Sequence, residues 1–121
     1  PALGLDIDRA GWEAAWRDLL APVDADGLAR VTVLRDYHAE NIMLLPGRVG
    51  VGALGLLDFQ DALIGHPAYD LVSVLEDARR DVSPAVEAEM LARYAAATAR
   101  DGRFTAAYWA LAAQRNTRIL G

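Results

Sequence analysis

Cysteine and lysine are both absent from the 121 residues of the chain. Because there is no cysteine, neither a disulfide framework nor a thiolate metal site can form. Arginine supplies every formally positive side chain, and acidic residues outnumber it, which gives a net charge of -5. A general nucleic-acid-binding protein normally carries a basic surface, so this balance argues against a nucleic-acid partner.

Long apolar runs are also absent, since charged residues or glycine interrupt them before they reach the length of a membrane span. The first residues, PALGLDIDRAG, lack the basic and apolar regions of a signal peptide. We therefore expect a soluble cytoplasmic protein that has no membrane partner. The apolar fraction of 54% is ample for a packed core, which argues against a wholly disordered chain.

Helical patterns occupy both ends of the chain. Asp8 precedes the segment RAGWEAAWRDLL, which reads as a capped amphipathic helix with one apolar face made by Trp12, Trp16, Leu19 and Leu20. Three further helices are expected over residues 69–80, over 84–100 with Ser83-Pro84 as its start and Asp101-Gly102 as its stop, and over 104–120.

A small β-rich patch separates the first helix from the others. Short strands are expected at VTVL (31–34), IMLL (42–45) and VGVGALGLLDF (49–59), with a turn at PGR (46–48). The pattern therefore predicts one α+β domain that is mainly helical and carries a small β-hairpin patch.

Two local patterns suggest sites that the surrounding sequence does not favour. GVGALG (50–55) matches a dinucleotide fingerprint, but the strand-like LLDF follows it where that fingerprint needs a helix. We therefore expect glycines within a hairpin strand. His38 and His66 could form a metal pair, but no compact ligand pattern accompanies them, so hydrogen-bonded imidazoles are favoured.

The stretch LRDYHAENIMLL (34–45) places a polar cluster between two strand-like segments. Asp36 and Asn41 fit the spacing D-x-x-x-x-N, and Asp58-Phe59 ends the following hairpin strand, as in a kinase catalytic loop followed by a metal-binding aspartate. A carboxylate can accept the proton of a hydroxyl that attacks a phosphate. Amide and carboxylate oxygens are suitable ligands for Mg²⁺. D-x-x-x-x-N alone is also common in solvated turns, so the joined order carries the prediction.

DFQDALIGHPAYDL (58–71) resembles the segment that follows the catalytic loop in aminoglycoside phosphotransferases and choline kinases. RDYHAEN, LLDFQDALIGHPAYDLVSVLEDARR and AAQRNTRILG resemble bacterial anomeric kinases of N-acetylmuramate and N-acetylglucosamine, which act in cell-wall sugar recycling. The resemblance covers nearly all of the chain from Val31 onward. It implies a protein-kinase-like C-terminal (large) lobe that uses ATP and Mg²⁺ to phosphorylate a sugar hydroxyl.

The same resemblance implies a role for each matching residue. Asp36 would be the catalytic base, and Asn41 and Asp58 would be the metal ligands that hold magnesium-ATP. Asp70 would brace the catalytic loop, and His38 would form a structural hydrogen bond. Leu34 stands where many kinases carry a histidine, which bears on how the loop is braced.

The polar cluster of Gln114, Arg115 and Asn116 lies on the last expected helix. It would either bind the substrate, with Arg115 and Asn116 as the candidate residues, or form a solvated or internally hydrogen-bonded face.

Kinases of this type also use a glycine-rich phosphate loop and a lysine from a small N-terminal lobe. Neither precedes Asp36, so residues 1–121 are expected to be the large lobe without its nucleotide lobe, which would be its partner. Such a lobe should be inactive alone, expose apolar surface near the β patch and be prone to self-association. The alternatives are an aminoglycoside- or choline-type phosphotransferase and a noncatalytic, pseudokinase-like binding module.

Overall fold

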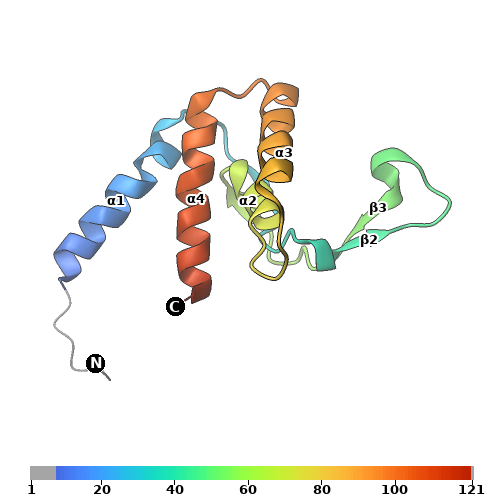
Figure 1. Ribbon diagram of the computed structural model, residues 1–121, viewed down its shortest axis with the longest axis horizontal. Coiled ribbons are helices and arrows are strands. Elements are labelled where there is room, and N and C mark those ends of the chain that lie inside the picture. The colour runs from blue at the N-terminus through green and yellow to red at the C-terminus, as the bar shows by residue number, and fades with distance from the viewer. Residues whose placement is uncertain (1–7, 121) are drawn as a thin grey trace.

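The computed structural model describes residues 8–120, so the domain expected over 1–121 and the segment PALGLDIDRAG lie partly outside the described residues. Helices dominate this part of the chain, as expected. They are α1 (Arg9–Ala25), α2 (Ala68–Leu75), α3 (Pro84–Ala97) and α4 (Gly102–Leu120). In Figure 1, α4 stands between α1 and the pair formed by α2 and α3.

The strands form two separate antiparallel pairs. One sheet joins β1 (Val31–Val33) to β4 (Leu63–Gly65), and the other is the hairpin of β2 (Ile42–Leu44) and β3 (Leu54–Leu56). The two registers place Thr32 opposite Ile64 and Met43 opposite Gly55. Helices with small antiparallel sheets confirm the α+β class.

The strand expected over 49–59 is wrong over most of its length. Gly50–Ala53 forms a short 3₁₀ helix, and only Leu54–Leu56 is a strand. Gly50 has φ +59°, a backbone conformation that glycine adopts without steric cost and that breaks the extended chain. Because a strand and no helix follows these glycines, GVGALG does not have the structure of a dinucleotide-binding turn. The sequence reading did not identify β4.

Two expected helix ends are also wrong. The helix expected to reach residue 80 ends at Leu75, and Asp77 then accepts a hydrogen bond from the backbone N–H of Arg79 at 3.2 Å. The following helix ends at Ala97, and Ala99 adopts φ +52°. Asp101 starts the next helix instead of stopping this one, because its carboxylate accepts the backbone N–H of Arg103 at 3.0 Å.

The two helix starts that the sequence marked are confirmed. Asp8 accepts the backbone N–H of Gly11 at 2.9 Å, and the Ser83 hydroxyl accepts that of Val86 at 3.3 Å. Each bond satisfies a donor that has no partner within the first turn of a helix.

The core lies where α2, α3 and α4 meet. Its largest fully buried side chains on α4 are Phe104 and Tyr108, and the cluster also contains Ala68, Val72, Leu75, Leu91, Leu111 and Ala112. The α1 helix contributes no buried residue, and Trp12 on its apolar face remains 55% exposed. The buried core therefore supports α2, and α2 supports the loop that follows β1.

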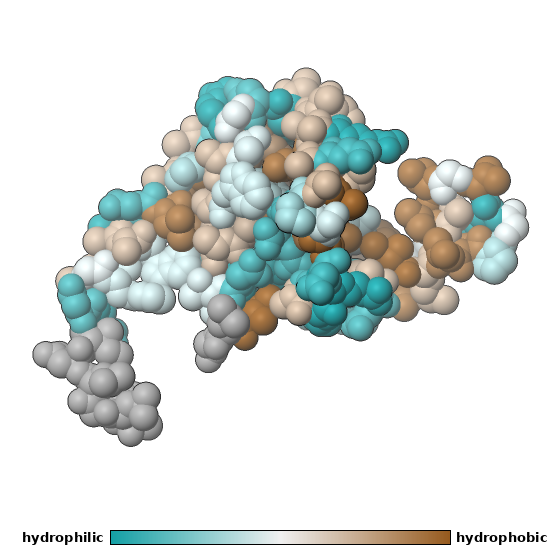
Figure 2. All heavy atoms as spheres, in the orientation of Figure 1, coloured by the Kyte–Doolittle hydropathy of each residue, from teal (hydrophilic) through white to brown (hydrophobic). Residues whose placement is uncertain are grey.

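Apolar side chains cover much of the β2–β3 hairpin and remain exposed. Figure 1 shows the hairpin projecting from the helices, and Figure 2 shows hydrophobic residues over it. Leu44, Val49 and Val51 are 77%, 89% and 90% exposed, respectively. The expected apolar surface near the β patch is therefore present.

Candidate active site

The loop between β1 and β2 is held by a carboxylate from the first turn of α2. The Oδ2 atom of Asp70 accepts the backbone N–H of Leu34 at 2.8 Å, and its Oδ1 atom accepts that of Arg35 at 3.0 Å. The Ser73 hydroxyl donates to the carbonyl of Arg35 at 3.2 Å. Arg35 has φ +72°, an uncommon conformation for a residue with a side chain. These bonds fix the backbone immediately before Asp36, including at the position where Leu34 replaces the usual histidine.

Backbone pairing brings Asp58 to the end of the hairpin that carries Asn41. The side-chain amide of Asn41 donates to the carbonyl of Asp36 at 2.9 Å. The backbone N–H of Leu57 donates to the carbonyl of Asn41 at 2.9 Å, so the pairing of β2 and β3 continues for one more step. Asp58 follows directly and adopts φ +53°. The hairpin therefore brings Asp58 to the end that carries Asn41, while the joint site and the chemical roles of Asp36, Asn41 and Asp58 stay predictions.

The donor chemistry of this end fits a magnesium ion that also binds phosphate. Asn41 uses its amide N–H on Asp36, which leaves the amide oxygen as its acceptor. Asp58 is exposed and offers a carboxylate. Within residues 8–120, no group of three or more histidine, cysteine, aspartate or glutamate side chains could hold a metal ion. Mg²⁺ commonly binds one or two carboxylates and completes its shell with phosphate oxygens and water, so a small donor set is adequate.

His38 is buried behind the loop. Its Nε2 atom lies 3.4 Å from the side-chain nitrogen of Asn41. Its Nδ1 atom is buried and has no hydrogen-bond partner among the described residues. The contact restrains Asn41, and the structural role expected of His38 stays a prediction.

His66 and Asp26 form a buried pair that the sequence reading did not identify. The Nε2 atom of His66 contacts the Asp26 carboxylate, and its Nδ1 atom accepts the backbone N–H of Ala68 at 3.1 Å. Because Nδ1 is an acceptor, Nε2 carries the proton that binds Asp26. Burial raises the pKa of Asp26, but hydrogen bonds from His66 and the Leu28 backbone outweigh burial and lower it. The pair links the end of α1 to the start of α2.

The polar cluster on α4 is distributed over three different environments. Arg115 is buried, with its guanidinium 5.9 Å from the centroid of the Tyr69 ring. Asn116 donates to Glu76 at 3.0 Å. Gln114 lines a cavity together with Arg35. Asn116 therefore has an internal hydrogen bond of the kind that the alternative reading expected, whereas the contact of Arg115 is with an aromatic ring. The role of both residues toward a substrate stays a prediction.

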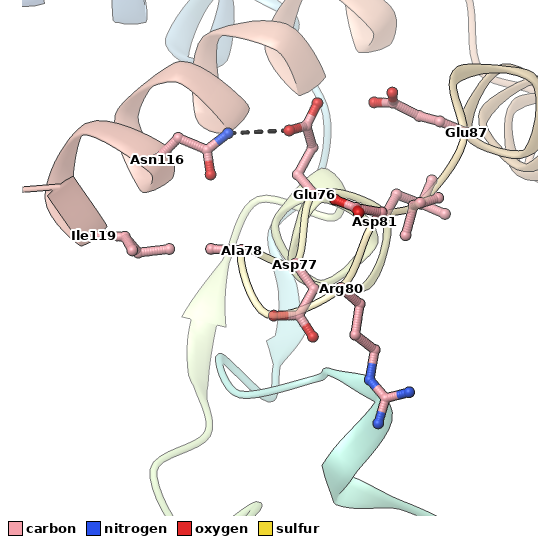
Figure 3. A pocket seen from close by; sticks show the side chains of 10 residues that line it. Glu76, Asp77, Ala78, Arg80, Asp81, Glu87, Asn116 and Ile119 are labelled. Carbon is pink, nitrogen blue, oxygen red and sulfur yellow. Dashed lines mark hydrogen bonds between the residues drawn. The ribbon is translucent and has the colours of Figure 1, made fainter.

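An acidic cavity of about 340 Å³ lies between the end of α2, the start of α3 and the end of α4. Figure 3 shows the hydrogen bond of Asn116 to Glu76 and the carboxylate of Glu87 on the facing side. Burial raises the pKa of Glu87, and the neighbouring Glu76 raises it further, whereas the hydroxyl of Tyr108, which donates at 2.8 Å, opposes this. Arg79 lies 3.7 Å from Glu40, which connects this cavity's loop to the candidate catalytic loop.

Among known protein families, the one described as Phosphotransferase enzyme family matches residues 2–108 of the chain. The chain belongs to this phosphotransferase family. The order of Asp36, Asn41 and Asp58 along the chain, which predicted a kinase-like site, therefore occurs in a member of a phosphotransferase family.

Two curated relatives of the chain share one name. The chain is 53% identical over 116 residues to the N-acetylmuramate/N-acetylglucosamine kinase of Caulobacter vibrioides. The matched region covers 93% of the chain and 31% of that relative. The chain is also 48% identical over 67 residues to the enzyme of that name from Neisseria meningitidis serogroup B. This match covers 55% of the chain and 18% of the relative. The resemblance to these sugar kinases is confirmed, and the chain spans less than a third of the first relative.

Among residues 8–120, no helix combines the length and the apolar character that crossing a bilayer requires.

Proposed function

We propose that this chain is the C-terminal (large) lobe of a kinase that transfers a phosphoryl group from ATP to a hydroxyl of an amino sugar, such as N-acetylmuramate or N-acetylglucosamine. The observation that carries this proposal is the junction of Asp36, Asn41 and Asp58 at one end of the hairpin, with Asp70 bonded to the preceding backbone. The names of the two relatives support the choice of substrate.

The proposed chemistry assigns one task to each side chain. Asp36 is exposed next to the fixed backbone of Arg35, and it orients the sugar hydroxyl and accepts its proton. Asn41 and Asp58 hold Mg²⁺, which neutralises charge on the phosphates when it is bound. Asp70 and His38 keep the loop and Asn41 in place. Phosphoryl transfer depends mainly on position and charge, so a rigid loop is the lobe's principal contribution.

The nucleotide requires a second wall that residues 1–121 do not supply. This sequence contains no lysine, and no glycine-rich phosphate loop precedes Asp36. We assign those functions to an N-terminal lobe in the rest of the protein, in agreement with a match to 31% of a relative's length. The complete enzyme would act in the cytoplasm, in the recycling of cell-wall amino sugars.

A second candidate function is phosphorylation of a cationic aminoglycoside. The acidic cavity favours it, because Glu76, Asp77, Asp81 and Glu87 line a space connected to the catalytic loop. Carboxylates attract ammonium groups, so the net charge of this cavity suits a cationic substrate.

The test is a substrate panel assayed with the full-length protein, ATP and Mg²⁺. N-acetylmuramate and N-acetylglucosamine should give sugar phosphate with higher kcat/KM than kanamycin or choline. A preference for kanamycin would replace the sugar assignment by the second candidate. Binding of ATP without turnover of any of these compounds would support a noncatalytic module instead.

A further inference from the structure

A basic cavity of about 390 Å³ has Arg35 and Arg118 in its wall, and its lining residues differ from those of the acidic cavity. Its polar wall consists of Arg35 from the candidate catalytic loop, Tyr69 from α2, and Gln114 and Arg118 from α4. β1 and β4 supply its apolar wall, and the buried His66 also lines it. Among the residues that the structure describes, no aspartate or glutamate lines this cavity. Since Arg35 directly precedes Asp36, one residue in the wall of this cavity is the sequence neighbour of the residue proposed to activate the substrate hydroxyl.

Both arginines of the basic cavity lack an ion-pair partner within residues 8–120, unlike Arg30, Arg79 and Arg103. Arg118 lies in the last turn of α4, where the helix dipole favours a positive charge whether or not a ligand is bound. That explanation does not apply to Arg35. The backbone of Arg35 is fixed by bonds to Asp70 and Ser73 and adopts φ +72°, so the loop holds this residue in one backbone position in the wall of the cavity.

Two guanidinium groups and an amide in one partly enclosed space are suited to an anion. Arginine forms paired, charge-assisted hydrogen bonds with planar carboxylates, and an amide N–H can add a further donor. A bound anion would also reduce the repulsion between the two positive charges. The cavity therefore favours a ligand that carries a carboxylate and disfavours a cationic one.

The two sugars of the proposed function differ in this respect. N-acetylmuramate carries a lactyl ether that ends in a carboxylate, whereas N-acetylglucosamine has a hydroxyl at that position. We propose that Arg35, Arg118 and Gln114 form a subsite for the carboxylate of N-acetylmuramate, so that this cavity determines preference for the acidic sugar. The inference rests on the proposed function, because it assumes that the enzyme phosphorylates both sugars.

Arg118→Gln in the full-length protein tests the subsite, since Arg118 is exposed near a helix end and its replacement spares the loop. The KM for N-acetylmuramate should rise about ten-fold, as expected for loss of a hydrogen bond between charged groups. The KM for N-acetylglucosamine should stay within about two-fold, because loss of an exposed charge has little effect elsewhere. Arg118→Lys should restore part of the affinity, and Arg17→Gln, at an exposed position of α1, should change neither value.

Removal of the charge from the substrate gives an independent measurement. The carboxamide of N-acetylmuramate should bind the parent enzyme about ten-fold more weakly than the acid, and Arg118→Gln should remove that difference. Inorganic phosphate, added as a competitor against N-acetylglucosamine, tests for a site that takes free anions. Phosphate inhibition that disappears in Arg118→Gln, combined with equal affinity of the parent enzyme for N-acetylmuramate and its carboxamide, would overturn the assignment to the substrate.

The remaining outcomes separate the subsite from the function. If the parent enzyme phosphorylates both sugars but Arg118→Gln changes both KM values equally or neither, the subsite is wrong and the kinase assignment stands. If the parent phosphorylates neither sugar, the proposed function and this inference both fail.

Discussion

At the scale of single residues, Asp36 is the most direct test of the proposed chemistry. Asp36→Asn in the full-length protein should lower kcat by about 10²- to 10⁴-fold, because it removes the proton acceptor. ATP affinity should change little, since the variant retains Asn41, Asp58 and the backbone carbonyl that Asn41 binds. Steady-state kinetics and an ATP titration measure the two effects.

The matched control is Asp58→Ala, which should weaken magnesium-dependent ATP binding in addition to turnover, because it removes a proposed metal ligand. Near-normal turnover in Asp36→Asn would reject Asp36 as the base. Equal loss of ATP binding in both variants would show that the exchange at Asp36 damages the fold of the loop.

Spacing along the sequence was sufficient to propose Asp36, Asn41 and Asp58 as one group, because a loop and a hairpin are local structures. It could not reveal the bond between His66 and Asp26, which are 40 positions apart. Such a pair depends on how α1 and α2 pack, and no local period records that packing. The same limit applies to Gln114, whose neighbours in the cavity come from elements distant in the sequence.

At the scale of secondary-structure elements, starts of helices were easier to predict than their ends. Asp8 and Ser83 cap their helices through short-range bonds that residue type alone suggests. The end of α2 depends on Asp77, whose side chain bonds the backbone of Arg79 and competes with helical pairing. The end of α3 depends on Ala99, a residue type that gives no stop signal. β4 was missed because its three residues are stabilised by the distant β1.

The Asp26–His66 pair should make the attachment of α1 to α2 sensitive to acid. The lowered pKa of Asp26 means that its ionised form stabilises the folded state. This stabilisation is complete above the ordinary value of 3.8 and is lost as pH falls through the lower value of the folded protein. Asp26→Asn should therefore reduce the free energy of unfolding by about 1–3 kcal/mol at neutral pH. It should also flatten the decline of stability below about pH 4.

Urea denaturation of the full-length protein between neutral and acidic pH measures this change. Asp24→Asn is the matched control, because Asp24 also pairs with Arg30, at 3.6 Å, but its side chain is 87% exposed. That control should alter stability by no more than about 1 kcal/mol. Identical pH profiles for the two variants would contradict a structural role for the buried pair.

At the scale of the whole molecule, the helices bury their largest apolar side chains, whereas the projecting hairpin leaves its apolar side chains exposed. The core buries Phe104 and Tyr108 completely, whereas Leu44, Val49 and Val51 remain on the surface. An exposed apolar area of this kind is typical of a surface that contacts another protein part. We assign it to contact with the N-terminal lobe, and in its absence to self-association of the chain through the hairpin.

This division predicts that residues 1–121 alone have no measurable kinase activity. The chain can offer Asp36, Asn41 and Asp58, but neither a lysine nor a glycine-rich loop is available to fix the phosphates and exclude water. The assay incubates the purified chain with Mg²⁺, ATP and N-acetylglucosamine and measures sugar phosphate, with the full-length protein as the control. Turnover by the chain at about 1–100 per second would be ordinary for a kinase. Such a rate would contradict the prediction. It would show that residues 1–121 position ATP by themselves, without a second wall of the cleft.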